Sequence, residues 1–344
     1  MKKKSFTFYL TFLLLSCQNE NCEHAIIDDF SINVPLVKDV SDLFDISERT
    51  IRLDTITEAM IGKVSKIVKH ENDFYVLSDE RRIVHFNNDG KCLSILDKRG
   101  IGPGEYTRII DFDLYTDNGN TELWICDIKE IRKYVRSEKT WNEAGTINFD
   151  FVIHKFKIIS NEHIIFVTGQ NEESLLLTDI KGIPLQNYLK NEFSFLMLRA
   201  IQFINYKSCI IFQLGISNEG IELDTKDFSF KHINIIENDR FLSSKELINI
   251  YDRYGIDYLG EVFKTNHIIG FRNISDFIWL EYKYQGNNFV ALHQNGVWKR
   301  LKYDREKNFM MTSLIFSESC DSFILFEYPE DDNLNLILHE YRLF

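Results

Sequence analysis

Six short apolar runs recur along this chain of 344 residues, and each run follows a polar turn. Their starts lie about 40 to 50 residues apart, with one longer gap of about 65 residues. A period of this size is typical of a β-propeller, in which each repeat forms one four-stranded blade. We therefore predict an all-β fold, a six-bladed β-propeller. The runs are NDFYVLSD from Asn72, TELWICD from Thr121, EHIIFVT from Glu162, SCIIFQL from Ser208, SDFIWLEY from Ser275 and DSFILFEY from Asp321.

Further strand candidates surround these runs and are separated by glycine, asparagine and aspartate turns, as in an all-β chain. The chain ends in one such candidate, residues 334–343. A propeller must close its ring, and an N-terminal strand often completes the last blade. We expect residues Thr50 to Asp54 to supply that strand.

The long gap between the fourth and fifth runs, about Asp239 to Gly260, contains a predicted helix. Ser243 and Glu246 have the spacing of a capping box, and Gly255 supplies a C-terminal stop. This insertion should pack on one end of the propeller, near the junction of blades four and five. It could cover part of the central mouth or only fill a gap between blades. Its predicted apolar face is Leu247, Ile250, Tyr251 and Tyr254.

The N-terminus has the pattern of a targeting segment. Three lysines precede the apolar run Phe6 to Leu15, which is too short to span a bilayer as a helix, and the run ends in Leu-Leu-Ser-Cys. This ending is typical of a bacterial lipobox, with cleavage before Cys17 and lipid on its sulfur; an ordinary signal peptide is the alternative. The predicted organisation is a signal peptide at 1–16, a lipidated tether at 17–45 and the propeller at 46–344.

The net charge and the cysteines argue against some classes of partner and site. The formal net charge of −12 and the absence of a basic stripe argue against a nucleic-acid partner. Five cysteines remain after Cys17, an odd number without a CxxC pair, and we expect core thiols rather than a redox or metal site. They are Cys22, Cys92, Cys126, Cys209 and Cys320.

A glycine-rich stretch, Gly100 to Tyr106, follows the Asn88-Asp89-Gly90 turn. A strand-like segment comes next, with no helix start and no Walker lysine, so a phosphate loop is disfavoured and a passage between blades is favoured. The turn and the G-x-GPGEY stretch resemble those of the six-bladed, NHL-like β-propeller lipoproteins of gut Bacteroidota. The resemblance implies lipidation and ring closure by an N-terminal strand, and it brings no assigned catalytic residues. That family often has arginine where this chain has Ile101.

The charged and aromatic residues around this stretch are the candidate binding site. They could contact a ligand at the mouth of the propeller, or Glu105 and Arg108 could only brace the loop. Asp111 and Asp113 share one face of the next strand, where hydrogen bonding at a blade edge is favoured over acid–base chemistry. The candidate binding residues are Arg99, Glu105, Tyr106 and Arg108, with Lys98 beside them.

Two functions of different classes remain. The leading hypothesis is a lipid-anchored outer-membrane protein that binds a glycan, a peptide or a membrane protein, with the leaflet left open. It rests on the lipobox, the propeller period and the lack of HExxH or GxSxG motifs. We expect no catalytic residue, metal ligand or cofactor. The alternative is a calcium-dependent lactonase or lyase with a metal in the central channel, which needs several oxygen ligands from different blades.

Overall fold

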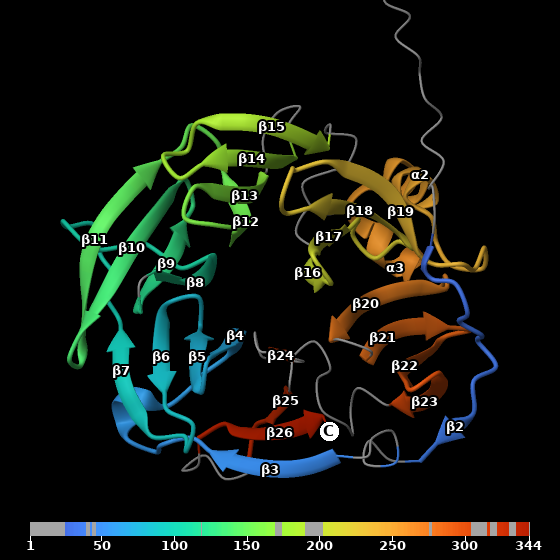
Figure 1. The fold of residues 1–344 in the computed structure, drawn as a ribbon, viewed down its shortest axis with the longest axis horizontal. Helices are drawn as coiled ribbons and strands as arrows, with labels where there is room; N and C mark the ends of the chain where they lie inside the picture. The colour runs from blue at the N-terminus through green and yellow to red at the C-terminus, as the bar shows by residue number, and fades with distance from the viewer. Residues whose placement is uncertain are drawn as a thin grey trace, which may run out of the picture.

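The protein, described here by a computed structural model, is a ring of six sheets around a central axis (Figure 1). The structure describes residues 25–38, 42, 46–117, 119–168, 174–189, 202–274, 277–303, 315–316, 322–329 and 335–343. In each sheet four antiparallel strands lie side by side, from an inner strand near the axis to an outer strand at the rim. The predicted six-bladed β-propeller is therefore confirmed.

The first three blades follow one another directly along the chain. Blade one contains β4 (Val64–His70), β5 (Asp73–Ser78), β6 (Arg82–Phe86) and β7 (Cys92–Leu96). Blade two contains β8 (Asp111–Asp117), β9 (Asn120–Asp127), β10 (Glu130–Ser137) and β11 (Thr140–Asn148). Blade three contains β12 (Ile153–Ile158), β13 (His163–Thr168), β14 (Leu175–Asp179) and β15 (Pro184–Leu189).

Blades four, five and six each also pair with one strand from the N-terminal part of the chain. Blade four contains β16 (Gln202–Tyr206), β17 (Cys209–Gln213), β18 (Glu219–Asp224) and β19 (Phe230–Ile236). Blade five contains β20 (His267–Ile274), β21 (Phe277–Tyr284), β22 (Asn287–Gln294) and β23 (Val297–Tyr303). Blade six contains β24 (Ile315–Phe316), β25 (Ser322–Glu327), β26 (Ile337–Leu343) and β3 (Ile46–Arg52).

Blade six closes the ring with an N-terminal strand as predicted, but that strand is Ile46–Arg52 rather than Thr50 to Asp54. Strand β3, from the N-terminal part of the chain, pairs antiparallel with β26, and Thr50 lies opposite His339. Asn335 strengthens the closure, because its side chain donates to the carbonyls of Asp54 (2.7 Å) and Ala59 (2.9 Å). Ala59 belongs to the short helix η2 (Thr57–Ala59), which leads into blade one. Residues nearly 300 positions apart therefore hold the first and last blades together.

The hydrophobic core lies between neighbouring blades. Buried apolar clusters occupy five blade junctions within the described residues, those between blades one and two, two and three, three and four, four and five, and six and one. In blades one to five the second strand has both faces covered, so its sequence is an almost continuous apolar run; Ile164 to Val167 of β13 are fully buried. The outermost strand β11 is mostly exposed. The six recurring runs of the sequence are the second strands of the six blades.

Part of the expected tether at 17–45 is packed on the propeller instead of lying apart from it. Strands β1 (Ala25–Ile27) and β2 (Leu36–Val37) pair in parallel with β19 and β23, as fifth strands of blades four and five. Between them, Phe30 is buried against both blades, with its ring centroid 5.0 Å from that of Trp298. Residues 25–37 thus form a strap across the rim, because their apolar side chains find partners there. The predicted lipidation site, Cys17, lies outside the described residues.

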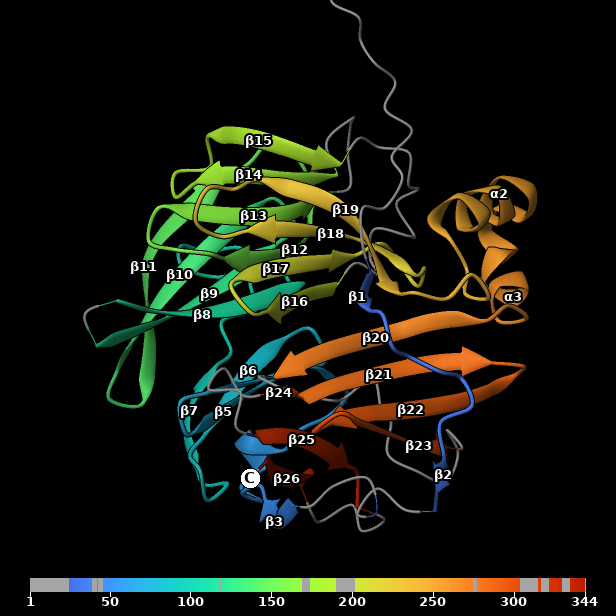
Figure 2. The same ribbon diagram turned by 45° about the vertical axis from the view of Figure 1, so that its right-hand side comes forward.

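The helical insertion lies between blades four and five in the chain, as predicted. Helix α2 (Ser244–Tyr254) begins with the expected capping box of Ser243 and Glu246, and Gly255 follows its last residue. The short helices η3 (Gly255–Asp257) and α3 (Tyr258–Val262) then lead to β20, and Figure 2 shows them beside the start of that strand.

Two details of the expected helix packing are wrong. Leu247 is buried, and Ile250 and Tyr251 pack against the same cluster, but Tyr254 is 40% exposed. That cluster also contains side chains of blades three and four, not of blade five. Leu247, Tyr258 and Val262 thus contribute to the propeller core, which favours the gap-filling role that the sequence left open.

Candidate ligand-binding site at the glycine-rich crossing

The glycine-rich stretch joins β7, the outer strand of blade one, to β8, the inner strand of blade two, as predicted. The helical insertion makes the same kind of connection between β19 and β20. Strands alternate in direction within each antiparallel blade, so all outer-to-inner connections lie at one end of the ring. We call this end the crossing face. It carries residues 97–110, the turn at 79–81 and the insertion.

Glu105 holds the crossing in shape. Its carboxylate accepts a hydrogen bond from the amide of Gly102 at 2.8 Å, and its own amide donates to the carbonyl of Gly102 at 3.1 Å. A Cβ atom on Gly100 would lie only 1.9 Å from Oε2 of Glu105, so a larger residue here would displace the Glu105 carboxylate. Gly104 has a φ of +73°, which favours glycine. The glycines and Glu105 are therefore one structural unit.

Tyr106 is a core residue, not a ligand contact. Only 1% of it is exposed, its hydroxyl donates to the carbonyl of Leu96 at 3.2 Å, and the amide of Lys98 donates to that hydroxyl at 3.1 Å. Burial raises the pKa of the Tyr106 hydroxyl above its ordinary value. The ammonium of Lys98 lies 5.7 Å from the ring centroid of Tyr134. The sequence grouped Tyr106 with surface residues because burial by blade two is a tertiary property.

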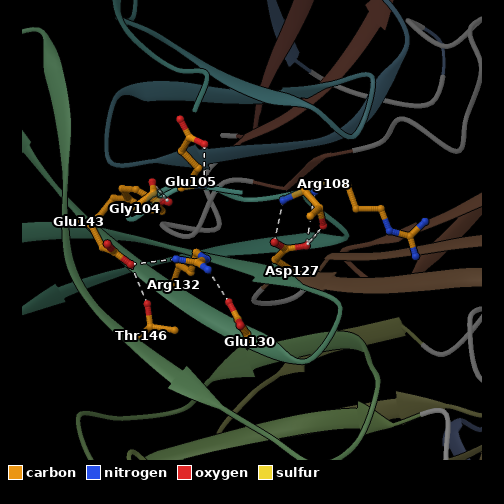
Figure 3. A network of polar contacts seen from close by, with 11 residues as sticks. Gly104, Glu105, Arg108, Asp127, Glu130, Arg132, Glu143 and Thr146 are labelled. Carbon is orange, nitrogen blue, oxygen red and sulfur yellow. Dashed lines mark hydrogen bonds and ion pairs between the residues drawn. The ribbon is translucent and has the colours of Figure 1, made fainter. Parts of the chain in front are cut away.

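Arg99 and Arg108 remain available to a ligand, since both are exposed. The base of the loop next to Arg108 is held by Asp127, which accepts hydrogen bonds from the amide and hydroxyl of Thr107 at 2.8 and 2.6 Å. Figure 3 shows the Arg108 side chain extending away from Asp127. Ile101, at the tip of the crossing, is 97% exposed.

Arg132 of β10 is a site residue that the sequence reasoning missed. Its guanidinium bonds Glu130 at 2.6 Å and Glu143 at 3.1 Å, and Glu143 also accepts from Thr146 at 2.7 Å (Figure 3). The side chain of Arg132 is 16% exposed. In the sequence, Arg132 lies in an ordinary strand in which polar and apolar residues alternate. Only the three-dimensional arrangement reveals the network.

The crossing forms a ridge between two open hollows. The first, of about 360 Å³, lies on the blade-two side and is lined by Glu105, Thr107, Asp127, Glu130 and Arg132 among others. The second, of about 580 Å³, is lined by Arg81, Asp97, Lys98, Arg99, Pro103, Gly104 and Glu105. Charged groups line both, but only the second is mainly polar at its surface and suits a polar ligand, because most of the exposed lining of the first is apolar. Glu105 lines both hollows, so it combines its structural role with a position at the surface.

The paired acids Asp111 and Asp113 have the predicted blade-edge role. Their carboxylates accept hydrogen bonds from the amides of Phe156 (3.1 Å) and Ile158 (3.0 Å) in β12. These amides belong to the innermost strand of blade three and point away from its partner β13. The two aspartates therefore connect blade two to the free edge of blade three.

The alternative of a calcium enzyme finds little support in the inner strands. Within the described ranges, no three His, Cys, Asp or Glu side chains are grouped so that they could hold a metal ion. The inner strands also carry Lys66 and Lys157, which form ion pairs with Asp111 and Asp113. The described cysteines, Cys92, Cys126 and Cys209, are free thiols, while Cys22 and Cys320 lie outside the described residues.

No helix in the part of the chain that the structure describes has the length and apolar character needed to cross a membrane.

The comparisons with known proteins support the fold. A Bacteroides fragilis protein described provisionally as exported has a TM-score of 0.71 at 11% identity, over 90% of this chain and 98% of its own. The RRP9 WD40 repeats and U3-55K each have a TM-score of 0.50, at 9% and 8% identity. They match 87% and 86% of this chain and 100% and 98% of their own. These identities show the fold alone, and no curated protein matches the chain.

A family model, described as DUF5128: 6-bladed beta-propeller, matches residues 16–311. The match ends just before β24, the inner strand of blade six. It covers far more than half of the chain, and it includes the glycine-rich crossing and the helical insertion. The chain therefore belongs to the DUF5128 family of six-bladed β-propellers.

Proposed function

We propose that this protein is an exported, lipid-anchored binding or scaffold protein of the cell envelope. Its partner would be a glycan, a peptide or a neighbouring outer-membrane protein held at the crossing face. The observation that carries the proposal is the ridge of the glycine-rich crossing, with an open hollow on each side and exposed Arg99 and Arg108. Loops placed on a rigid scaffold are the usual carriers of binding function.

The proposed envelope location has two supports. One is the lipobox-like end of the signal segment at Cys17. The other is the Bacteroides fragilis protein of the same fold, which is described provisionally as exported. Gln18 follows the cysteine rather than an aspartate, so we place the protein in the outer membrane of a diderm bacterium, as in the Bacteroidota lipoproteins that it resembles.

Lipidation at Cys17 would also constrain the orientation of the ring. Ala25, the first residue of the strap, follows Cys17 after eight peptide steps (25 − 17), which span at most about 28 Å when fully extended. The rim of blades four and five would then lie close to the membrane. The crossing face, at one end of the ring, would stay open to a partner.

The anchor can be tested by cell fractionation. Replacing Cys17 by serine should release the protein into the soluble envelope fraction, because each buried methylene of a lipid chain contributes about 0.8 kcal/mol of membrane affinity. A Cys17→Ser protein that stays with the membranes would contradict the anchor but would leave the ligand site untouched.

The binding site can be tested by affinity capture from native envelopes. The double variant Arg99→Ala/Arg108→Ala should lose the partner or polysaccharide that the natural protein recovers. The matched control is Lys91→Ala/Lys139→Ala, which removes two exposed cations at turns on the opposite end of the ring. Equal recovery by both double variants would refute the crossing face as the binding site.

A further inference from the structure

The second hollow of the crossing face, of about 580 Å³, is lined mainly by charged side chains. They come from the turn between β5 and β6 and from the glycine-rich crossing. The volume lies within the range of sites that bind small molecules. Five of the seven lining residues are charged, namely Arg81, Asp97, Lys98, Arg99 and Glu105.

The backbone that carries Lys98 and Arg99 is fixed by its own hydrogen bonds. The carbonyl of Lys98 accepts from the amide of Tyr106 at 3.0 Å, and the amide of Gly100 donates to the carbonyl of Tyr106 at 2.9 Å. Arg99, between these two bonds, forms a parallel bridge with the buried Tyr106. A side chain on a fixed backbone loses less conformational freedom on binding a ligand than one on a loose loop.

Two of the three cations in the hollow have no carboxylate partner in the part of the chain that the structure describes. Arg81 is paired with Asp97 at 3.4 Å. The ammonium of Lys98 instead lies over the ring of Tyr134, 5.7 Å from its centroid. Arg99 is exposed, and its guanidinium makes no hydrogen bond or ion pair with any other described residue. The hollow therefore offers two free cationic donors.

The two carboxylates of the hollow each keep one free oxygen. Oδ2 of Asp97 is bound to Arg81, and Oε2 of Glu105 accepts from the amide of Gly102 at 2.8 Å. Oδ1 of Asp97 and Oε1 of Glu105 accept no hydrogen bond from the described residues. A simple anion would be repelled by these oxygens, whereas a hydroxyl group beside an anionic group can donate to them.

We propose that this hollow binds an acidic sugar unit of a polysaccharide, a ring with one anionic group and neighbouring hydroxyls. Lys98 and Arg99 bind the anionic group, while Asp97 and Glu105 accept from hydroxyls. Three cations against two carboxylates leave one net positive charge, which one carboxylate or sulfate ester neutralises. The net charge of −12 on the whole chain is screened beyond about 8 Å at physiological salt, so the local charge decides. The inference rests on the proposed function, since it names an acidic glycan as the partner of the crossing face.

Isothermal titration of the full chain with the trimer of galacturonate tests the site. The methyl-esterified trimer, which has the same rings without charge, is the reference. We expect the acid to bind at least about tenfold tighter than the ester, and less tightly as sodium chloride is raised. Lys98→Met and Arg99→Met should each weaken the binding of the acid at least about fivefold, because each removes a charge-assisted donor. The matched control Lys91→Met, at a turn on the other end of the ring, should leave the affinity unchanged.

Asp97→Ala separates recognition of a sugar from simple attraction between charges. Removal of this carboxylate makes the hollow more positive, so N-acetyl triglutamate, which has carboxylates but no hydroxyls, should bind more tightly. The galacturonate trimer should instead bind several-fold more weakly, because the loss of a charge-assisted hydrogen bond outweighs a screened attraction. If Asp97→Ala tightened the binding of both compounds, the hollow would be an unspecific anion site and the sugar assignment would be wrong.

A galactose trimer that carries sulfate esters distinguishes the sources of the charge. Tighter binding than the galacturonate trimer indicates a sulfate ester, and weaker binding indicates a uronate. Failure of the galacturonate, glucuronate and sulfated trimers to bind refutes the inference. If affinity capture then still recovers a partner that Arg99→Ala/Arg108→Ala loses, the proposed function stands without the acidic sugar. If capture fails as well, both are refuted.

Discussion

Asp111 allows a direct measurement of how strongly one blade is held to the next. Its carboxylate is almost fully buried, and it accepts hydrogen bonds from the Phe156 amide at 3.1 Å and from Lys66 at 2.7 Å. It also accepts from the amide of Phe112 at 2.9 Å. The substitution Asp111→Ala removes all three bonds while leaving the apolar core between blades in place.

The expected cost follows from these contacts. The amide of Phe156 lies on the inner edge of β12 and loses its carboxylate acceptor, which costs about 1–3 kcal/mol for a buried donor. The Lys66 side chain is 34% exposed, so the loss of its ion pair adds no more than about 1 kcal/mol after allowing for solvent screening. We expect a total of about 1–4 kcal/mol. For a chain of this size, that lowers the midpoint of thermal unfolding by roughly 1–6 °C.

Urea unfolding followed by circular dichroism measures this loss. Asp111→Asn keeps an oxygen acceptor for Phe156 but loses the charge, so it should cost roughly half as much. Asp252→Ala, an exposed change on α2, is the matched control and should stay within about 0.5 kcal/mol of the natural protein. An Asp111→Ala variant as stable as Asp252→Ala would refute the argument that aspartates of blade two hold the edge of blade three.

Three further predictions concern other parts of the ring. Gly100→Ala should displace Glu105 from the Gly102 amide, cost about 1 kcal/mol and speed amide exchange across residues 98–106. Ser243→Ala should lower stability by about 1 kcal/mol through loss of the capping box, and Ser243→Asp should restore most of it. Burial lowers the pKa of His85, although Asp73 opposes this, so the folded state binds fewer protons than the unfolded state. Urea unfolding should therefore show stability falling as the pH drops below about 6.5, with a shallower fall in His85→Gln.

Much of the fold could be predicted because it depends on local patterns. In blades one to five the second strand is covered on both faces, and that burial demands an unbroken apolar run such as Ile164 to Val167. The capping box at Ser243 needs only the three residues that follow it. The closing strand could be placed because a ring needs one strand from the other end of the chain.

The candidate site could be predicted only in part. The glycine-rich crossing is visible in the sequence because Gly104 has a positive φ that favours glycine and Glu105 is held against the neighbouring glycines. The burial of Tyr106 and the contribution of Arg132 were missed, since both depend on how blade two packs against this loop. The exposure of Tyr254 was missed for the same kind of reason, because the cluster beneath α2 extends only as far as Tyr251.

The sequence by itself determined that six similar units must form, because each unit carries its own apolar run and its own turns. Only the tertiary structure decided what lies between those units. Residues 25–37 read as a polar tether, yet they pair with β19 and β23 because two distant blades create an edge for them. Lys66, Asp111 and Phe156 lie 45 residues apart in turn, and the packing of blades one, two and three brings their polar groups within hydrogen-bond distance. Their convergence follows from the geometry of the ring, which no local stretch of sequence encodes.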